Sequence, residues 1–322
     1  MTIKRMTSLL AALALLALVA VPALADAENQ KYEEKFQKVE KLAADGKVYL
    51  KNISGNVKVL TWDKDEVKID ALKISRAGTL EEAKENAALV KIEVGRNDGR
   101  LEILTDYPDD QWRHKRLNVS VNYDLTIPAK AEVEVRNVSG DVSAENIGGY
   151  AKLETVSGDV NLRKAAKGGV FTTVSGDVEL GDISGDLRTK AVSGDITITR
   201  IAGSVNAETV SGNVELKGLT GAKSIEINVL SGDVIFEGVL EKDGRYNFQS
   251  HSGDVTLYLP EKSAFEFSCK SFSGDIDSDF EMVVKMIGGL KHKKNDIRGE
   301  VNGGGADLTI TTFSGDIELK KR

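Results

Sequence analysis

Polar and apolar residues alternate along most of the chain after residue 136, and short turns interrupt them at regular distances. In residues 174–192, Val-Ser-Gly-Asp leads into one alternating run, and Ser-Gly-Asp-Leu leads into a second. Alternation with a period of two predicts β-strands that bury one face. Each unit of eighteen residues therefore contains two turns and two strands.

The turn motif is Ser-Gly-Asp/Asn followed by Val, Ile or Leu, and it occurs eleven times. Its serines are Ser54, Ser139, Ser157, Ser175, Ser184, Ser193, Ser211, Ser231, Ser252, Ser273 and Ser314. From Ser139 to Ser211 a copy recurs every eighteen residues, and later steps widen to twenty and twenty-one. A constant period of this length predicts a stack of similar structural units.

The register of these units predicts the fold class. Stacked hairpins would not keep one register through five successive units, whereas parallel coils do so naturally. We expect an all-β fold, a single-chain parallel β-helix (β-solenoid) with coils of about 18–21 residues over 136–322. A polar excursion at 278–305, which includes the basic run 291–294, interrupts the stack before a final coil.

The turn residues have a structural interpretation. Glycine adopts the positive φ of a sharp bend at least cost, and Asp or Ser side chains bond nearby backbone amides. We assign structural turns to Gly140, Gly158, Gly176, Gly185, Gly194, Gly212, Gly232, Gly253, Gly274 and Gly315. The alternative for the acids is a cation-binding ladder of Asp141, Asp159, Asp177, Asp195, Asp233, Asp254 and Asp275. The first interpretation is preferred, because calcium requires six to eight oxygen ligands.

Residues 26–135 lack the repeat, and we expect an irregular β region there that is continuous with the solenoid. Alternation predicts strands at 47–61, joined by a bend at 52–56, and at 117–127. Thr79 and Glu82 form a capping box that predicts a helix over 80–90, which would cover the end or flank of the sheet.

Residues 1–25 read as a cleaved signal peptide. Lys4 and Arg5 precede an apolar core of about 13 residues, too short for a membrane span of ~20, and cleavage is expected near Ala25. We expect an exported protein, periplasmic or extracellular, with no transmembrane segment after cleavage. Losing Lys4 and Arg5 changes the net charge from −7 to −9, which argues against nucleic acid as a partner.

No catalytic, metal or cofactor motif stands out. The repeated Ser lacks the Gly-x-Ser-x-Gly elbow of a hydrolase, and His114, His251 and His292 have no metal-ligand spacing. The only cysteine, Cys269, alternates with Phe265 and Phe267, which predicts a buried thiol. The exposed strand positions carry Lys, Glu, Thr and Asn, which predicts a flat polar face.

The chain resembles the bacterial putative-adhesin family of β-strand repeats, catalogued as domain of unknown function 4097. The resemblance is carried by Asn52-Ile-Ser-Gly-Asn-Val57 with Thr61-Trp-Asp63, by the helix at 80–90, by Val138-Ser-Gly-Asp-Val142 with its repeats, and by Thr312-Phe-Ser-Gly-Asp-Ile317. It covers nearly all of the chain after residue 25. It implies an exported or envelope-associated β-helical domain without known enzymatic residues.

These observations favour a non-catalytic exported β-solenoid that binds or scaffolds at the cell envelope, with no cofactor. Its partner would be an envelope protein or glycan lying along a strand face or at the N-terminal region. The alternatives are a self-assembling structural protein and, less favoured, a carbohydrate-active β-helix enzyme. The sequence leaves monomer and self-assembly undecided.

Overall fold

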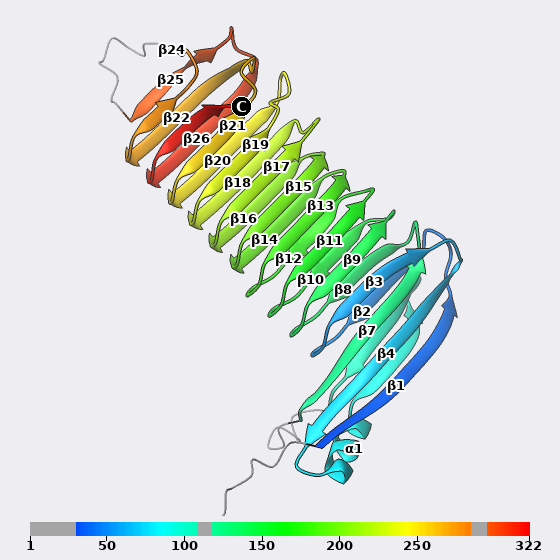
Figure 1. The fold of residues 1–322 in the computed structure, drawn as a ribbon. Coiled ribbons are helices and arrows are strands. Elements are labelled where there is room, and N and C mark those ends of the chain that lie inside the picture. Colours follow the sequence, from blue (N-terminus) through cyan, green and yellow to red (C-terminus); the bar gives the residue numbers. More distant parts are fainter. Residues whose placement is uncertain (1–29, 109–116, 285–294) are drawn as a thin grey trace, which may run out of the picture.

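Two long β-sheets face one another along a rod in this computed structural model (Figure 1). The structure describes residues 30–108, 117–284 and 295–322. The predicted signal peptide 1–25, His114 and the basic run 291–294 lie outside the described residues.

Sheet A and sheet B contain nearly all of the described secondary structure. In spatial order, sheet A consists of β1 (Gln30–Lys41), β4 (Glu66–Ala77), β7 (Val119–Pro128), β3 (Val57–Trp62), β9 (Val142–Ile147), β11 (Val160–Ala165), β13 (Val178–Ser184), β15 (Ile196–Ala202), β17 (Val214–Leu219), β19 (Val234–Gly238), β21 (Val255–Leu259), β27 (Ile317–Lys321) and β23 (Ile276–Ser278). Sheet B consists of β24 (Val283–Val284), β25 (Asp296–Val301), β22 (Phe265–Ser273), β26 (Ala306–Ser314), β20 (Arg245–Ser252), β18 (Ser224–Ser231), β16 (Val205–Ser211), β14 (Leu187–Ser193), β12 (Gly169–Thr172), β10 (Ala151–Glu154), β8 (Glu132–Arg136), β2 (Lys47–Lys51), β6 (Arg100–Asp106) and β5 (Lys91–Asn97).

Equivalent strands of successive coils pair in parallel, which confirms the predicted β-solenoid. In sheet A, Val160 pairs with Val142 of the preceding coil and with Val178 of the next. Sheet B keeps the same register, with Leu153 opposite Val135 and Phe171. The constant register follows from the period, because each coil places the same repeat position at the same height.

The core lies between the two sheets and is built from rows of equivalent side chains. The residue after the turn Asp or Asn points inward and is buried in most coils, as in Val160 and Ile196, whereas Ile276 at the end of sheet A is only partly buried. Ile147, Ile183 and Leu219 form a second buried row on the same sheet. Each such side chain contributes about 1.5–3 kcal/mol when it leaves water, so the rows stabilise coil stacking.

The order of the coils differs from the sequence order at both ends. Strands β2 and β3 lie between β6–β7 and β8–β9, although they precede β6 and β7 in the chain. Likewise, β26 and β27 lie between β20–β21 and β22–β23. The last repeat therefore continues the stack, but it lies closer to the middle of the rod than the coil that precedes it in sequence.

Antiparallel strands lie beyond the inserted coils. At the N-terminal end, β4 and β1 follow β7 in sheet A, and β5 follows β6 in sheet B. Residues 30–108 and 117–135, expected to be an irregular β region, thus combine these antiparallel strands with parallel strands such as β2 and β3. The charged twelve-residue strand β1 was not predicted, because its sequence does not alternate cleanly between apolar and polar residues.

The expected polar excursion at 278–305 is partly sheet. Strand β25 pairs with β22 in antiparallel fashion, and the two-residue strand β24 pairs with β25. Phe280 is buried against Phe265, with 5.7 Å between the ring centroids. The excursion thus supplies part of the C-terminal cover of the core.

Helix α1 (Leu80–Leu89) lies beside β1 and β4 at the N-terminal end (Figure 1). The amide of Glu82 donates to the Thr79 hydroxyl at 3.1 Å, as the capping box predicts. Ala83 and Ala87 are buried, so the helix covers the flank of the end strands.

Candidate functional site

The sharp turns from sheet B to sheet A bring backbones of neighbouring coils very close together. Gly158 has φ of 145°, and a Cβ at this position would lie 2.3 Å from the carbonyl oxygen of Gly140. Gly176 repeats this contact against Gly158, with a distance of 2.1 Å. A side chain is excluded at these glycine positions for two reasons: the positive φ disfavours residues with a Cβ, and the backbone of the neighbouring coil is too close.

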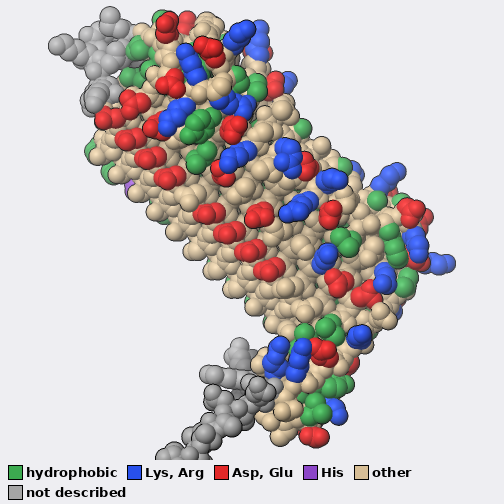
Figure 2. All heavy atoms as spheres, viewed as in Figure 1, with side chains coloured by type: hydrophobic (Ala, Val, Ile, Leu, Met, Phe, Trp, Pro, Cys, Tyr) green, Lys and Arg blue, Asp and Glu red, His purple; other side chains and the backbone are tan. Residues whose placement is uncertain are grey.

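The turn aspartates hydrogen-bond between coils, and not within their own turns as the sequence suggested. The amide of Asp159 donates to Asp141 Oδ1 at 3.0 Å, and the amide of Asp177 donates to Asp159 Oδ1 at 2.8 Å. Asn213 continues the series by accepting from the amide of Asp233. Acidic side chains follow this edge of the rod in Figure 2.

The less favoured alternative from the sequence, a cation ladder, involves these same aspartates. Within the described ranges, no three His, Cys, Asp or Glu side chains form a group that could hold a metal ion. Cation binding along the edge stays the untested alternative, and thermal unfolding in millimolar calcium measures it.

A row of buried hydroxyls and amides stabilises the turns, and sequence analysis missed it. The hydroxyl of Thr155 donates to the carbonyl of Gly140 at 3.0 Å, and that of Thr173 donates to Gly158 at 2.9 Å. The Asn137 side chain donates to the same Gly140 carbonyl. The sequence signal is a polar residue two places before the turn serine, but Ala191 and Val229 interrupt it.

An exposed row of mostly apolar side chains runs along the rod immediately before the turn serines. We call it the apolar row, and its members, in spatial order, are Ile53, Val138, Val156, Val174, Val192, Val210, Leu230, His251, Phe313 and Phe272. Val138, Val156, Val174 and Val210 are 40–46% exposed, and Phe272 is 70% exposed. The predicted flat polar face is therefore wrong along this line.

The C-terminal part of the apolar row is a stack of aromatic rings. His251 lies 4.9 Å from Phe313, and Phe313 lies 4.7 Å from Phe272, with interplanar angles of 16° and 4°. A groove of about 510 Å³ runs beside these rings, with Lys190 and Lys270 among the residues that line it. His251 thus belongs to a surface stack at the turn edge.

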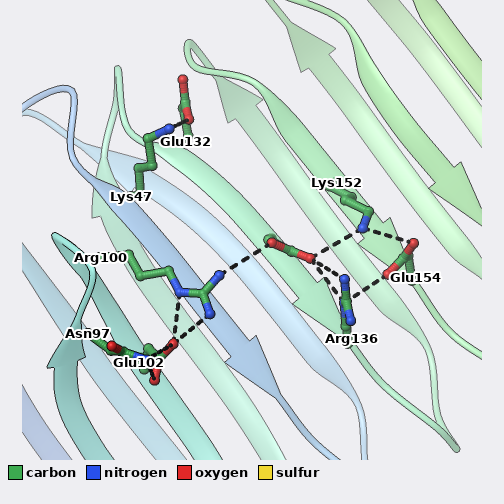
Figure 3. Close-up of polar contacts among 9 residues, drawn as sticks. Lys47, Asn97, Arg100, Glu102, Glu132, Arg136, Lys152 and Glu154 are labelled. Carbon is green, nitrogen blue, oxygen red and sulfur yellow. Dashed lines mark hydrogen bonds and ion pairs between the residues drawn. The ribbon is translucent and has the colours of Figure 1, made fainter.

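A second surface lies on sheet B near the N-terminal end, where charged side chains form one connected network (Figure 3). We call it the ion-pair face, and it is made by Arg100, Glu102, Glu134, Arg136, Lys152 and Glu154. Arg100 bridges Glu102 at 2.7 Å and Glu134 at 4.0 Å. Glu134 also contacts Arg136 at 2.9 Å and Lys152 at 3.3 Å.

Tyr49 on β2 lies within the ion-pair face. The Arg100 guanidinium is 4.4 Å from the centroid of the Tyr49 ring, and that of Arg136 is 5.9 Å away. Contacts of this kind are attractive because the ring face is electron-rich. A depression of about 230 Å³, lined by Tyr49, Tyr150 and Lys152 among others, opens beside them. Distant segments meet here because β2 is inserted between β6 and β8.

The shifted pKa values describe ion pairs and burial. A hydrogen bond from Arg200 lowers the pKa of the Asp182 carboxyl, and one from Lys320 lowers that of Glu318. Within the described ranges, the carboxyl groups with resolved shifts all move downward, whereas a general acid needs a raised pKa. Burial raises the pKa of the Cys269 thiol to about 12, and the predicted burial of Cys269 is confirmed.

The family model described as Toastrack DUF4097 matches residues 29–233 and 73–320 in two overlapping segments. A putative adhesin from Bacteroides fragilis is 13% identical, with 89% of this chain and 97% of that chain covered and a TM-score of 0.39. A putative lipid binding protein from Parabacteroides distasonis is 11% identical over the same shares, with a TM-score of 0.40. No curated protein matches the sequence. In the described ranges, no helix has the length and apolarity to cross a membrane.

Proposed function

The chain belongs to the Toastrack DUF4097 family, and from this membership and the ion-pair face we propose that it is a non-catalytic exported rod that binds an envelope partner. The partner is a polar protein or glycan, and it lies across the ion-pair face at the N-terminal end of sheet B. The protein acts by binding and scaffolding, without a cofactor.

The observation that carries this proposal is the connected network of charges on the three strands β6, β8 and β10, with β2 lying between β6 and β8. Arg100, Glu134 and Arg136 contact one another or shared partners at 2.7–4.0 Å, so each charge is held in place before a ligand arrives. A prearranged surface loses less side-chain entropy on binding than a flexible one. Tyr49 and the 41% exposed Tyr150 add aromatic surface beside these charges, as interfaces commonly do.

The pKa directions support binding over catalysis. The described carboxyl groups with resolved shifts have cationic neighbours that stabilise the charged form. Such groups favour recognition by charge, whereas proton transfer to a substrate needs a carboxyl held neutral near neutral pH. The proposal therefore places the carbohydrate-active alternative last, and a panel of polysaccharides tests it directly.

Retention of the purified mature protein on isolated envelope fractions tests the proposal. We expect retention at low salt that weakens as salt rises, because exposed charges are screened. Tyr49→Ala and Arg100→Ala should each weaken retention by about tenfold, the usual effect of an interface anchor.

Lys217→Ala is the matched control, because Lys217 pairs with Glu215 on the outer face of sheet A. It removes a surface ion pair of similar kind and should leave retention unchanged. Equal loss in the control and in Arg100→Ala, or no retention of the wild type at any salt concentration, would refute the proposal.

A further inference from the structure

We propose that the apolar row is the interface at which a second copy of this chain docks, with the two rods side by side and parallel. The row lies along the turn edge and only borders the ion-pair face at Arg136 and Glu154. The inference uses the apolar side chains of the row and does not rest on the proposed function.

The first support is the spacing of the row. Ser157 and Ser175 pair directly in neighbouring coils, and the amide of Ser175 donates to the Val156 carbonyl at 2.8 Å, so row members lie one coil apart. At roughly 4.8 Å per coil, the nine steps from Ile53 to Phe272 extend about 43 Å. A partner must present apolar groups at the same spacing over this length, and a second copy does so by construction.

The second support is area. Nine of the ten row members are exposed, up to 70% for Phe272, and Val192 is half-buried. Together they correspond to a strip on the order of 700 Å². A stable protein interface buries about 800 Å² on each partner. The strip is also larger than the ~300–600 Å² typical of the largest apolar patch on a monomer.

Charge selects the relative orientation of the two rods. The turn aspartates, such as Asp177 and Asp195, flank the row on one side. On the other side, two residues before the row, the outward side chains are mixed in charge: the cations Arg136, Lys190 and Lys270 stand among the acids Glu154 and Glu208. In a parallel pair the two-fold axis runs along the rods. The turn aspartates of each copy then face the flank of mixed charge on the other copy. Antiparallel rods would instead set aspartates against aspartates, which is unfavourable.

Other occupants fit the row less well. Sugar rings stack on aromatic faces, but His251, Phe313 and Phe272 cover one another's faces and leave only the outer face of Phe272. An anionic lipid surface would meet the aspartate edge of a chain whose net charge is −7. An added peptide strand needs a free backbone edge, whereas row strands such as β16 and β18 are paired on both sides.

Sedimentation of the purified mature protein over a concentration series tests the pairing. We expect a dimer, and Val174→Glu combined with Leu230→Glu should weaken it by at least about 100-fold, because both charges would be buried at the interface. Val239→Glu is the matched control: Val239 is 42% exposed, close to the 40% of Val174, but lies outside the row. A wild-type monomer up to about 100 μM, or equal dissociation in the control, overturns the proposal.

The orientation is tested by cross-linking single-cysteine variants, with the buried Cys269 left in place. Parallel rods place each residue opposite itself, so Val156→Cys and Leu230→Cys should each form disulfide-linked dimers alone. Linkage only when the two variants are mixed would show antiparallel rods and overturn the orientation. A monomer whose row variants lose binding to neutral polysaccharide or to anionic vesicles would assign the row to that ligand instead.

Discussion

In the middle of the rod, strands β10 to β19 pair with the coils directly before and after them in sequence, whereas at both ends a coil distant in sequence is inserted. The middle consists of parallel strands with one repeated turn. The ends add antiparallel strands, namely β1, β4 and β5 at one end and β24 and β25 at the other. The comparison shows that one repeat suffices to propagate the stack, while closing it requires different chain segments.

The physical reason lies in the unpaired edges of the sheets. A terminal coil of a β-solenoid exposes a row of backbone N–H and C=O groups that invites pairing with another chain. Here charged residues of β1 and the short strands β23 and β24 occupy the ends of the sheets. Such ends disfavour end-to-end growth, and they agree with association along the side of the rod.

Replacing turn glycines gives the largest expected contrast between the middle and the ends. Gly158→Ala should lower the free energy of unfolding by at least about 3 kcal/mol, because its Cβ would lie 2.3 Å from the Gly140 carbonyl oxygen. Gly99→Ala, in the hairpin between β5 and β6, should cost only about 1 kcal/mol. Gly99 also has a positive φ, but nothing lies within 4 Å of its Cβ position.

Urea unfolding followed by circular dichroism measures both variants. Similar losses would show that positive φ alone sets the cost of a turn substitution. The close contact between coils would then have little energetic weight.

Alkaline pH should destabilise the N-terminal end of the rod. Burial raises the pKa of Tyr123 from 10 to about 12, and the hydroxyl pairs with that of Thr105 at 2.7 Å. The pKa of Tyr123 is higher in the folded than in the unfolded state, so ionisation of its hydroxyl favours unfolding. The stability that the neutral hydroxyl contributes is complete below pH 10 and is lost as pH rises to 12. The loss should approach about 2 kcal/mol.

Unfolding free energies between pH 8 and 12 measure this effect for the wild type and for Tyr123→Phe. The Phe variant should show a flatter decline above pH 10, after a constant cost of about 1 kcal/mol for the lost hydrogen bond. Identical alkaline slopes for the two proteins would exclude Tyr123 as the source.

The buried hydroxyl row provides a smaller test, within the middle of the rod. Thr173→Val should cost about 1–2 kcal/mol, because it leaves the Gly158 carbonyl without its hydroxyl partner. Ala191→Thr should stabilise the next coil by up to about 1 kcal/mol by supplying the missing donor. Thermal unfolding measures both variants, and an unchanged midpoint for Thr173→Val would contradict the role of the row.

Sequence reasoning predicted the middle of the rod well and the ends only in part. The strands near Val48 and Val57 and the helix after Thr79 were expected from their local patterns, and each is present. Strand β1 was missed because charged residues dominate it. The ion-pair face was also missed. Arg100 on β6 and Glu134 on β8 contact each other across the intervening strand β2, and local sequence patterns do not show that β2 is inserted there.

The sequence by itself determined the coil, because glycine at constant intervals is the residue that permits both the turn and the contact between turns. Only the tertiary structure decided which coils are neighbours at the ends. Strands with the same alternation are compatible with many partners, and the choice among them depends on segments far apart in the chain. It also decided that valines before the turn serines face outward, because the chain begins to bend there and period two alone does not say which side is buried.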